Sequence, residues 1–298
     1  MLRPALRIPR VRLAPGPRQQ SIHTMPKLPH NFTQGVPGLL SADGFDMAWS
    51  QYMQHTLDKL NALTEGTELE DRDTKQILHA TARDPDQAPV FNHASMAHNT
   101  HFFFRALTPS PKPMPETLQR QLTTSFSSIE TLRRELTLTA ASMFGPGFVW
   151  LVKTSSTVGN TPSMYTSSPG GPIRPGASTY GPSSAGEQEY KVLTTYLAGS
   201  PYPGAHWRQQ STDMNTVGAN GTAAPYIRNA QRALTPNPGR APGGLEVIPL
   251  LCLSTWEHTW LRDYGVGGKK AFAEAWWDSI DWSVVSDLAS IRARPTRA

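Results

Sequence analysis

The chain has 298 residues, of which 38% are hydrophobic and 17% charged, and its 23 Gly and 27 Pro favour much irregular structure. No window approaches 18 uninterrupted apolar residues, which argues against a membrane-spanning helix and a membrane partner. The single cysteine, Cys252, excludes an intramolecular disulfide and a thiolate metal cluster. We expect Cys252 to be a small buried apolar residue rather than a reactive thiol.

The formal charge of +5 is concentrated at the start of the sequence. Five arginines lie in the first 20 residues, and the remainder carries 23 Lys and Arg against 23 Asp and Glu. An acid-free start with arginines spaced among apolar residues is typical of a mitochondrial transit peptide, predicted here for residues 1–24 with cleavage between Arg18 and Met25. The alternative is a disordered basic tail that binds RNA or acidic lipid. The near-neutral remainder does not support a globally basic nucleic-acid-binding protein.

Helical periodicity dominates the first half of the chain. Apolar residues at three- and four-residue steps predict a helix over residues 43–63, with Ser41 as its N-cap. Further helices are expected at 76–83, from Pro89 to Phe104, at 116–124 and at 127–143. The last begins with a capping-box pattern, in which Ser127 caps the helix and Glu130 bonds back to it.

The pattern then changes to short apolar runs, which predict strands over 148–152, 191–197 and 246–253. Helices follow at 256–264, 269–279 and 282–291. Several helices, a small sheet and more helices indicate an α+β fold. Two segments rich in Gly, Pro and Ser, residues 154–189 and 204–244, interrupt the strands, and we expect them to be disordered or to order only on a partner. They are either docking elements or neutral surface insertions.

Three segments resemble the iron/manganese superoxide dismutases. Residues 91–104 are similar to the second metal-ligand helix of that family, residues 145–151 to its glycine-flanked Trp-x-Trp strand, and residues 249–258 to its Asp-x-Trp-Glu-His segment. The resemblance covers about 45–151, 190–203 and 246–290, in family order. It implies an N-terminal helical hairpin over 38–110 and a C-terminal α/β domain over 111–292, with a three-stranded antiparallel sheet packed with helices.

The same resemblance implies that the metal site is lost. The family holds its metal with three histidines and one aspartate, a ligand set suited to iron or manganese. The first histidine position is Ala48, the second is Thr100 and the aspartate position is Ser254; only the last histidine is retained, as His258. His101 lies next to Thr100, but one residue along a helix turns a side chain by about 100°.

The groups around the ligands have changed as well. The family's active-site tyrosine corresponds to Thr56, and the histidine at its substrate entrance corresponds to Tyr52. Met96 stands where iron enzymes have a glutamine, and Phe148 replaces the first strand tryptophan. Such groups orient the ligands and tune the metal, so we expect no metal cofactor and no dismutase activity. The alternative is an active dismutase or another metalloenzyme with a rearranged site built from His93, His98, His101 and His258.

In the dismutases, a glutamate and a histidine of the Trp-Glu-His segment link two subunits. Glu257 and His258 retain this pair, which favours pairing, although Glu257 could instead simply face solvent on its helix. The mitochondrial address, the lost ligands and the insertions together resemble the dismutase-like proteins of the fungal mitochondrial small ribosomal subunit. This resemblance implies a structural ribosomal component in the matrix that contacts other small-subunit proteins and pairs with a related dismutase-like paralogue.

Local contact with ribosomal RNA is a further expectation. The candidate residues are the arginines of the second insertion and of the C-terminal tail, Arg228, Arg232, Arg240, Arg292, Arg294 and Arg297. Their alternative role is a solvated surface, which the near-zero charge of the remainder favours. A free mitochondrial scaffold or chaperone-like dimer is the third functional class that the sequence leaves open.

Overall fold

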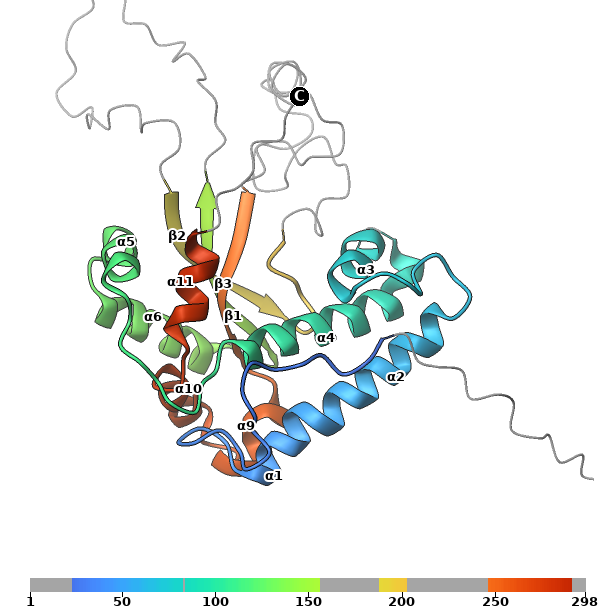
Figure 1. Cartoon of the computed structure of the whole chain (residues 1–298), viewed down its shortest axis with the longest axis horizontal. Helices are drawn as coiled ribbons and strands as arrows, with labels where there is room; N and C mark the ends of the chain where they lie inside the picture. Colours follow the sequence, from blue (N-terminus) through green and yellow to red (C-terminus); the bar gives the residue numbers. More distant parts are fainter. Residues whose placement is uncertain (1–22, 83, 156–187, 203–245, 291–298) are drawn as a thin grey trace, which may run out of the picture.

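The computed structural model describes residues 23–82, 84–155, 188–202 and 246–290 (Figure 1). Residues 1–22, nearly all of both insertions and the six candidate RNA-binding arginines lie outside the described residues. Among the helices described, none is long and apolar enough to cross a membrane.

The first predicted helix is confirmed, with one irregularity. It consists of three contiguous elements, α1 (Ala42–Phe45), the π-helical η1 (Asp46–Gln51) and α2 (Tyr52–Thr64). Ser41 caps it as predicted, and its hydroxyl accepts a hydrogen bond from the Gly44 N–H at 3.0 Å. A π-helical turn inside an α-helix often marks a functional site. Here it contains Ala48, which the resemblance aligns with the first ligand position of the family.

A turn joins α2 to the other helices of the N-terminal hairpin, α3 (Thr74–Thr81), the short 3-10 helix η2 (Pro85–Gln87) and α4 (Ala88–Arg105). Helix α3 begins two residues before the prediction because Asp73 caps it. The Asp73 carboxylate accepts from the backbone of Gln76, and the Gln76 side chain accepts from the backbone of Asp73. This reciprocal capping box stabilises the first turn. Helices α2 and α3 both pack against α4.

The link between α5 (Glu116–Phe126) and α6 (Ile129–Ser142) corrects one prediction. Ser128, not Ser127, is the N-cap of α6, and its hydroxyl accepts from the Thr131 N–H at 3.0 Å. Ser127 has φ 65°, a left-handed conformation that ends α5. The capping box between Ser127 and Glu130 is therefore wrong, because the preceding helix takes Ser127 as its own terminus.

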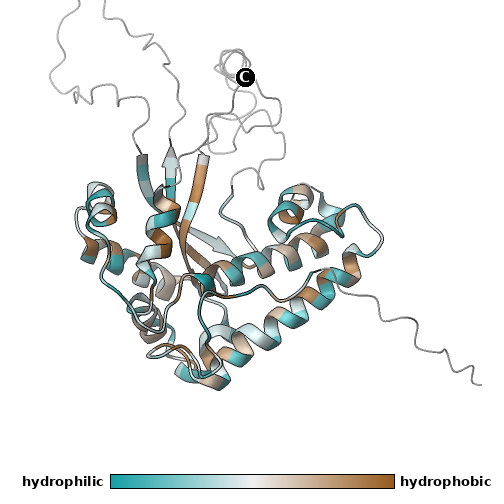
Figure 2. Ribbon diagram, viewed as in Figure 1, coloured by the Kyte–Doolittle hydropathy of each residue, from teal (hydrophilic) through white to brown (hydrophobic). Residues whose placement is uncertain are grey.

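Within the described residues, one sheet contains β1 (Gly147–Ser155), β2 (Gln188–Tyr196) and β3 (Glu246–Ser254) in the order β2-β1-β3. Both neighbours of β1 run antiparallel to it, which confirms the α+β fold and the antiparallel sheet. The register between β1 and β3 shifts between Leu151 and Val152, opposite Pro249. Proline has no N–H to donate, and an edge strand with a bulge tolerates it. Strand β3 is hydrophobic along most of its length (Figure 2).

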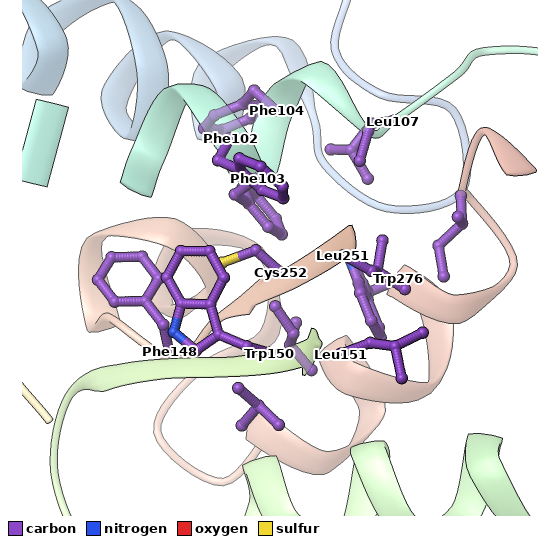
Figure 3. Close-up of a cluster of buried hydrophobic side chains, with 14 of the residues drawn as sticks. Phe102, Phe103, Phe104, Leu107, Phe148, Trp150, Leu151, Leu251, Cys252 and Trp276 are labelled. Carbon is purple, nitrogen blue, oxygen red and sulfur yellow. The ribbon is translucent and has the colours of Figure 1, made fainter. Parts of the chain in front are cut away.

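Three helices complete the chain, α9 (Glu257–Tyr264), α10 (Lys269–Trp277) and α11 (Trp282–Ser290). Helix α10 packs on α6, and α11 packs on β3. The main core lies between α4 and the sheet. In Figure 3, Phe102, Phe103 and Phe104 of α4 lie over the side chains of Phe148, Trp150 and Cys252. Cys252 is fully buried, and burial raises the pKa of its thiol, as expected for a structural cysteine.

A short segment after β2 connects the sheet to the hairpin. The Ser95 hydroxyl donates to the Ala198 carbonyl at 2.6 Å, and the Asn99 amide donates to the Gly199 carbonyl at 3.0 Å. Tyr202 then enters a second apolar cluster that otherwise consists of hairpin residues. Its hydroxyl lies 2.9 Å from Nε2 of His98. These contacts hold the end of β2 against α4, and we call them the Tyr202 clamp.

Candidate functional site

The position that the resemblance aligns with the first dismutase ligand, Ala48, offers no donor atom. Ala48, Tyr52 and Thr56 are spaced four residues apart and therefore share one helix face. Ala48 is fully buried and has only a methyl group. The Thr56 hydroxyl is also buried, and it donates to the Tyr52 carbonyl at 2.8 Å within its own helix. This helix face is consistent with packing, and it carries no imidazole or carboxylate group.

The second ligand position is equally changed. Met96 and Thr100 lie one helical turn apart on α4, and both side chains are buried. The neighbouring His101 does not replace the lost ligand. Its ring lies 6.0 Å from that of Trp49, and the backbone of Lys27 is near it. Burial and the nearby charge of Arg105 lower the pKa of His101.

The end of β3 and the start of α9 supply the other two positions. The Ser254 hydroxyl is buried, and it lies 3.1 Å from the Thr259 hydroxyl. His258 stacks face to face on Tyr52, with 3.8 Å between ring centroids and 14° between ring planes. Burial lowers the pKa of His258 to about 4, so the imidazole is neutral at pH 7. The stack connects α2 to α9, two elements far apart in sequence.

Aromatic side chains of β1 and α4 pack beside these positions. Phe148, which replaces a family tryptophan, is fully buried, and its ring centroid lies 5.8 Å from that of Trp150. Phe102 packs on Trp150 from the opposite element, at 5.6 Å. The Trp150 indole N–H is satisfied by the Thr195 hydroxyl at 2.9 Å. The region is therefore filled with aromatic rings (Figure 3).

The structure contradicts the alternative prediction of a metal site built from His93, His98, His101 and His258. His93 bonds the Pro89 carbonyl, His98 bonds Tyr202 and His258 stacks on Tyr52. His98 and His101 are three residues apart on α4, but their rings have different surroundings. The His98 ring bonds the Tyr202 hydroxyl, whereas the His101 ring lies near Trp49 and the backbone of Lys27. In the part of the chain that the structure describes, no group of three or more His, Cys, Asp or Glu side chains could hold a metal ion.

The residues at the four family positions do not fit iron or manganese. Of the four, an alanine has no donor, two are neutral hydroxyls and one is a histidine committed to a ring stack. Anionic carboxylate and imidazole donors are what these metals need in a redox site. We therefore assign no reaction step to a metal here.

The pairing residues lie at the start of α9. Glu257 is its first residue, and both Glu257 and His258 are half-buried. Trp256 precedes them, and its indole N–H donates to the Leu197 carbonyl at 3.3 Å. Leu197 in turn donates its N–H to the Pro146 carbonyl at 3.0 Å. These contacts bring the start of β1, the end of β2 and the start of α9 together.

Exposed apolar side chains gather at this end of the sheet. Phe144 is 96% exposed, Leu197 60% and Tyr196 53%. Val266, at 89%, follows α9, and Lys269 ties that turn to the loop of Phe144 by donating to the Met143 carbonyl at 2.7 Å. We call these four residues with Trp256 the sheet-end surface. Leu197 also has φ 53°, which costs a branched side chain about 1–2 kcal/mol. Strain retained in an exposed apolar residue points to a functional surface.

Charge is distributed unevenly between the described residues and the rest. The whole chain carries 28 Lys and Arg against 23 Asp and Glu, yet Asp and Glu outnumber Lys and Arg among the described residues. The described part of the chain is therefore net acidic, and the excess of Lys and Arg lies in the remaining residues.

Part of the chain matches the model of a known protein family. The family model for the iron/manganese superoxide dismutases, C-terminal domain, matches residues 114–170 and 225–288. The resemblance to this fold is therefore confirmed, although the residues at the ligand positions differ.

Individual relatives narrow the comparison. The chain is 26% identical to small ribosomal subunit protein mS43 of Schizosaccharomyces pombe over 274 residues, 89% of this chain and 83% of the relative. It is 25% identical to mS42 of the same organism over 217 residues, 71% of each chain. An iron superoxide dismutase of Nostoc is 27% identical over 143 residues, 48% of this chain and 72% of the enzyme. The predicted similarity to dismutase-like ribosomal proteins is confirmed.

Proposed function

We propose that the protein is a structural component of the small subunit of the mitochondrial ribosome. It acts in the mitochondrial matrix, supports mitochondrial translation and has no catalytic activity. The observation that carries this proposal is the extent of similarity: mS43 aligns with 89% of the chain, whereas the Nostoc dismutase aligns with 48%.

The absence of enzyme activity is supported by the residues themselves. Dismutation needs an ion that cycles between two oxidation states, and Ala48, Thr100 and Ser254 offer no ligand set that would hold one. The neutral His258, stacked on Tyr52, completes the packing in the same region. The scaffold is retained for its shape and its surfaces.

A related dismutase-like chain is the partner that we propose for the sheet-end surface. Glu257 and His258 correspond to the residues that link subunits in the dismutases. They directly follow Trp256, which belongs to the sheet-end surface. Exposed aromatic and aliphatic side chains at one end of a sheet favour a protein partner, because their burial supplies most of the association free energy. Other small-subunit proteins contact the remaining faces. RNA contact is local and secondary, since the described part of the chain, which excludes the candidate arginines, is net acidic.

Gradient sedimentation tests the ribosomal assignment. The chain, tagged at its C-terminus, is expressed in fungal mitochondria, and the lysate is separated at moderate salt. We expect the tagged chain in the small-subunit fractions, shifting with the subunit when magnesium is removed. Recovery at the top of the gradient would contradict the assignment and favour a free scaffold or chaperone-like dimer.

A further inference from the structure

The chain enters the fold through a segment that precedes every helix. We call residues 23–32 the N-terminal strap. In Figure 1 the strap is the dark blue trace that starts near the end of α2, passes between α2 and α4 and reaches the C-terminal half.

His23 is the anchor at the first end of the strap. Its backbone N–H donates to Oδ1 of Asn61 at 2.9 Å, and its carbonyl accepts from Nδ2 of the same amide at 3.0 Å. The His23 imidazole adds a contact of 3.5 Å with the Thr64 hydroxyl. One side chain of α2 thus satisfies both backbone groups of residue 23, as a neighbouring strand would.

The rest of the strap is held along its length. Met25 and Leu28 are partly buried and pack against the main core. Phe32 is 2% exposed, and its ring lies 5.7 Å from that of Phe45. His30 reaches across to Asp281, just before α11, with 3.4 Å between Nε2 and Oδ2. The strap therefore bridges the helical hairpin and the C-terminal half.

We infer that maturation leaves His23 in the protein and that presequence processing cuts the chain before this residue. The inference rests on the proposed mitochondrial location, because it concerns the removal of a presequence. The sequence alone allows a cut anywhere from Arg18 to Met25. A cut after His23 would remove the anchor, and the Asn61 amide would lose both of its backbone partners. The inferred cut therefore lies between Arg18 and His23.

The structural part of the inference is tested on the purified protein. Two versions of the chain, one beginning at His23 and the other at Pro26, are compared with and without Asn61→Ala. We expect Asn61→Ala to lower the thermal midpoint of the longer version by roughly 4–8 °C, about two net hydrogen bonds in a chain of this size. The same substitution should change the shorter version by less than about 2 °C, because the partner is already gone.

His23→Ala is the matched control, because it keeps both backbone bonds to Asn61. We expect it to lower the midpoint by less than about 2 °C. Failure of the Pro26 version to fold would support the need for the strap. Equal midpoints for the two versions, or equal effects of Asn61→Ala in both, would overturn the inference.

The position of the cut is measured on protein recovered from mitochondria. N-terminal peptide mapping should find a processed chain that begins at or before His23. A chain that begins at Thr24 or later, or an unprocessed chain, would overturn the inference. Sedimentation of the same sample reports separately on the ribosomal assignment. A correctly processed chain at the top of the gradient would thus refute the proposed function and leave the strap intact.

Discussion

The stack of Tyr52 on His258 occupies the region where the dismutase fold would hold a metal, and it is open to a quantitative test. Tyr52→Ala removes a partly buried ring that makes a parallel contact at 3.8 Å. Loss of a fully buried aromatic ring costs about 3–5 kcal/mol, so we expect roughly 2–3 kcal/mol for this partly buried one. In a chain of this size each kcal/mol lowers the thermal midpoint by about 2–4 °C, which gives a drop of roughly 4–12 °C.

A double-mutant cycle isolates the stack from the rest of the burial. Urea unfolding followed by circular dichroism measures the wild type, Tyr52→Ala, His258→Ala and the double variant. We expect a coupling free energy of about 0.5–1.5 kcal/mol, the value typical of aromatic pairs. Tyr52→Phe is the control, and it should retain the coupling. Additive effects of the two alanine substitutions would show that the rings do not support one another and would refute the reasoning.

Three further predictions follow from the described contacts. Stability should fall between pH 7 and pH 5, because the unfolded chain binds protons at histidine near pH 6.5, whereas burial lowers the folded-state pKa of His98 to about 3 and that of His258 to about 4. The loss of stability is roughly 2 kcal/mol per histidine, and His258→Phe should remove the part that comes from His258. If His258→Phe left the pH dependence of the urea midpoint unchanged, the prediction would be contradicted. Leu197→Gly should change the free energy of unfolding by less than about 1 kcal/mol, because relief of left-handed strain offsets the entropic cost of glycine. The same substitution should weaken co-purification with the paired chain. Full retention of pairing would argue against a role of the sheet-end surface in pairing. Tyr202→Phe should lower stability by about 1–2 kcal/mol in urea unfolding, because His98 loses its hydroxyl partner, whereas the exposed Tyr196→Phe should have no effect; equal effects would argue against the clamp.

Local sequence pattern was sufficient for most of the fold. Helical periodicity located the first helix, and its Ser41 cap is confirmed. The strands were found in the right places because their apolar runs fill a buried sheet. The mistakes fall at element ends. Ser127 and Ser128 are both acceptable caps by residue type, and only the termination of α5 decides between them.

The candidate site divides in the same way. The resemblance to the family assigns the four ligand positions to Ala48, Thr100, Ser254 and His258, and this assignment stays a prediction. What now fills the region could not be predicted, because Tyr52 and His258 are distant in sequence and meet only in the tertiary structure. The same reason hides the Tyr202 clamp and the bonding of His23 to Asn61. The i, i+3 spacing of His98 and His101 suggested a shared metal face, but packing gave each ring a different partner.

The metal content of the purified, folded chain tests the central claim most directly. We predict iron and manganese well below one equivalent after expression in medium that supplies both metals, with no superoxide turnover and a thermal midpoint that a chelator does not change. One equivalent of manganese or iron per chain, with dismutation in proportion to it, would contradict the account.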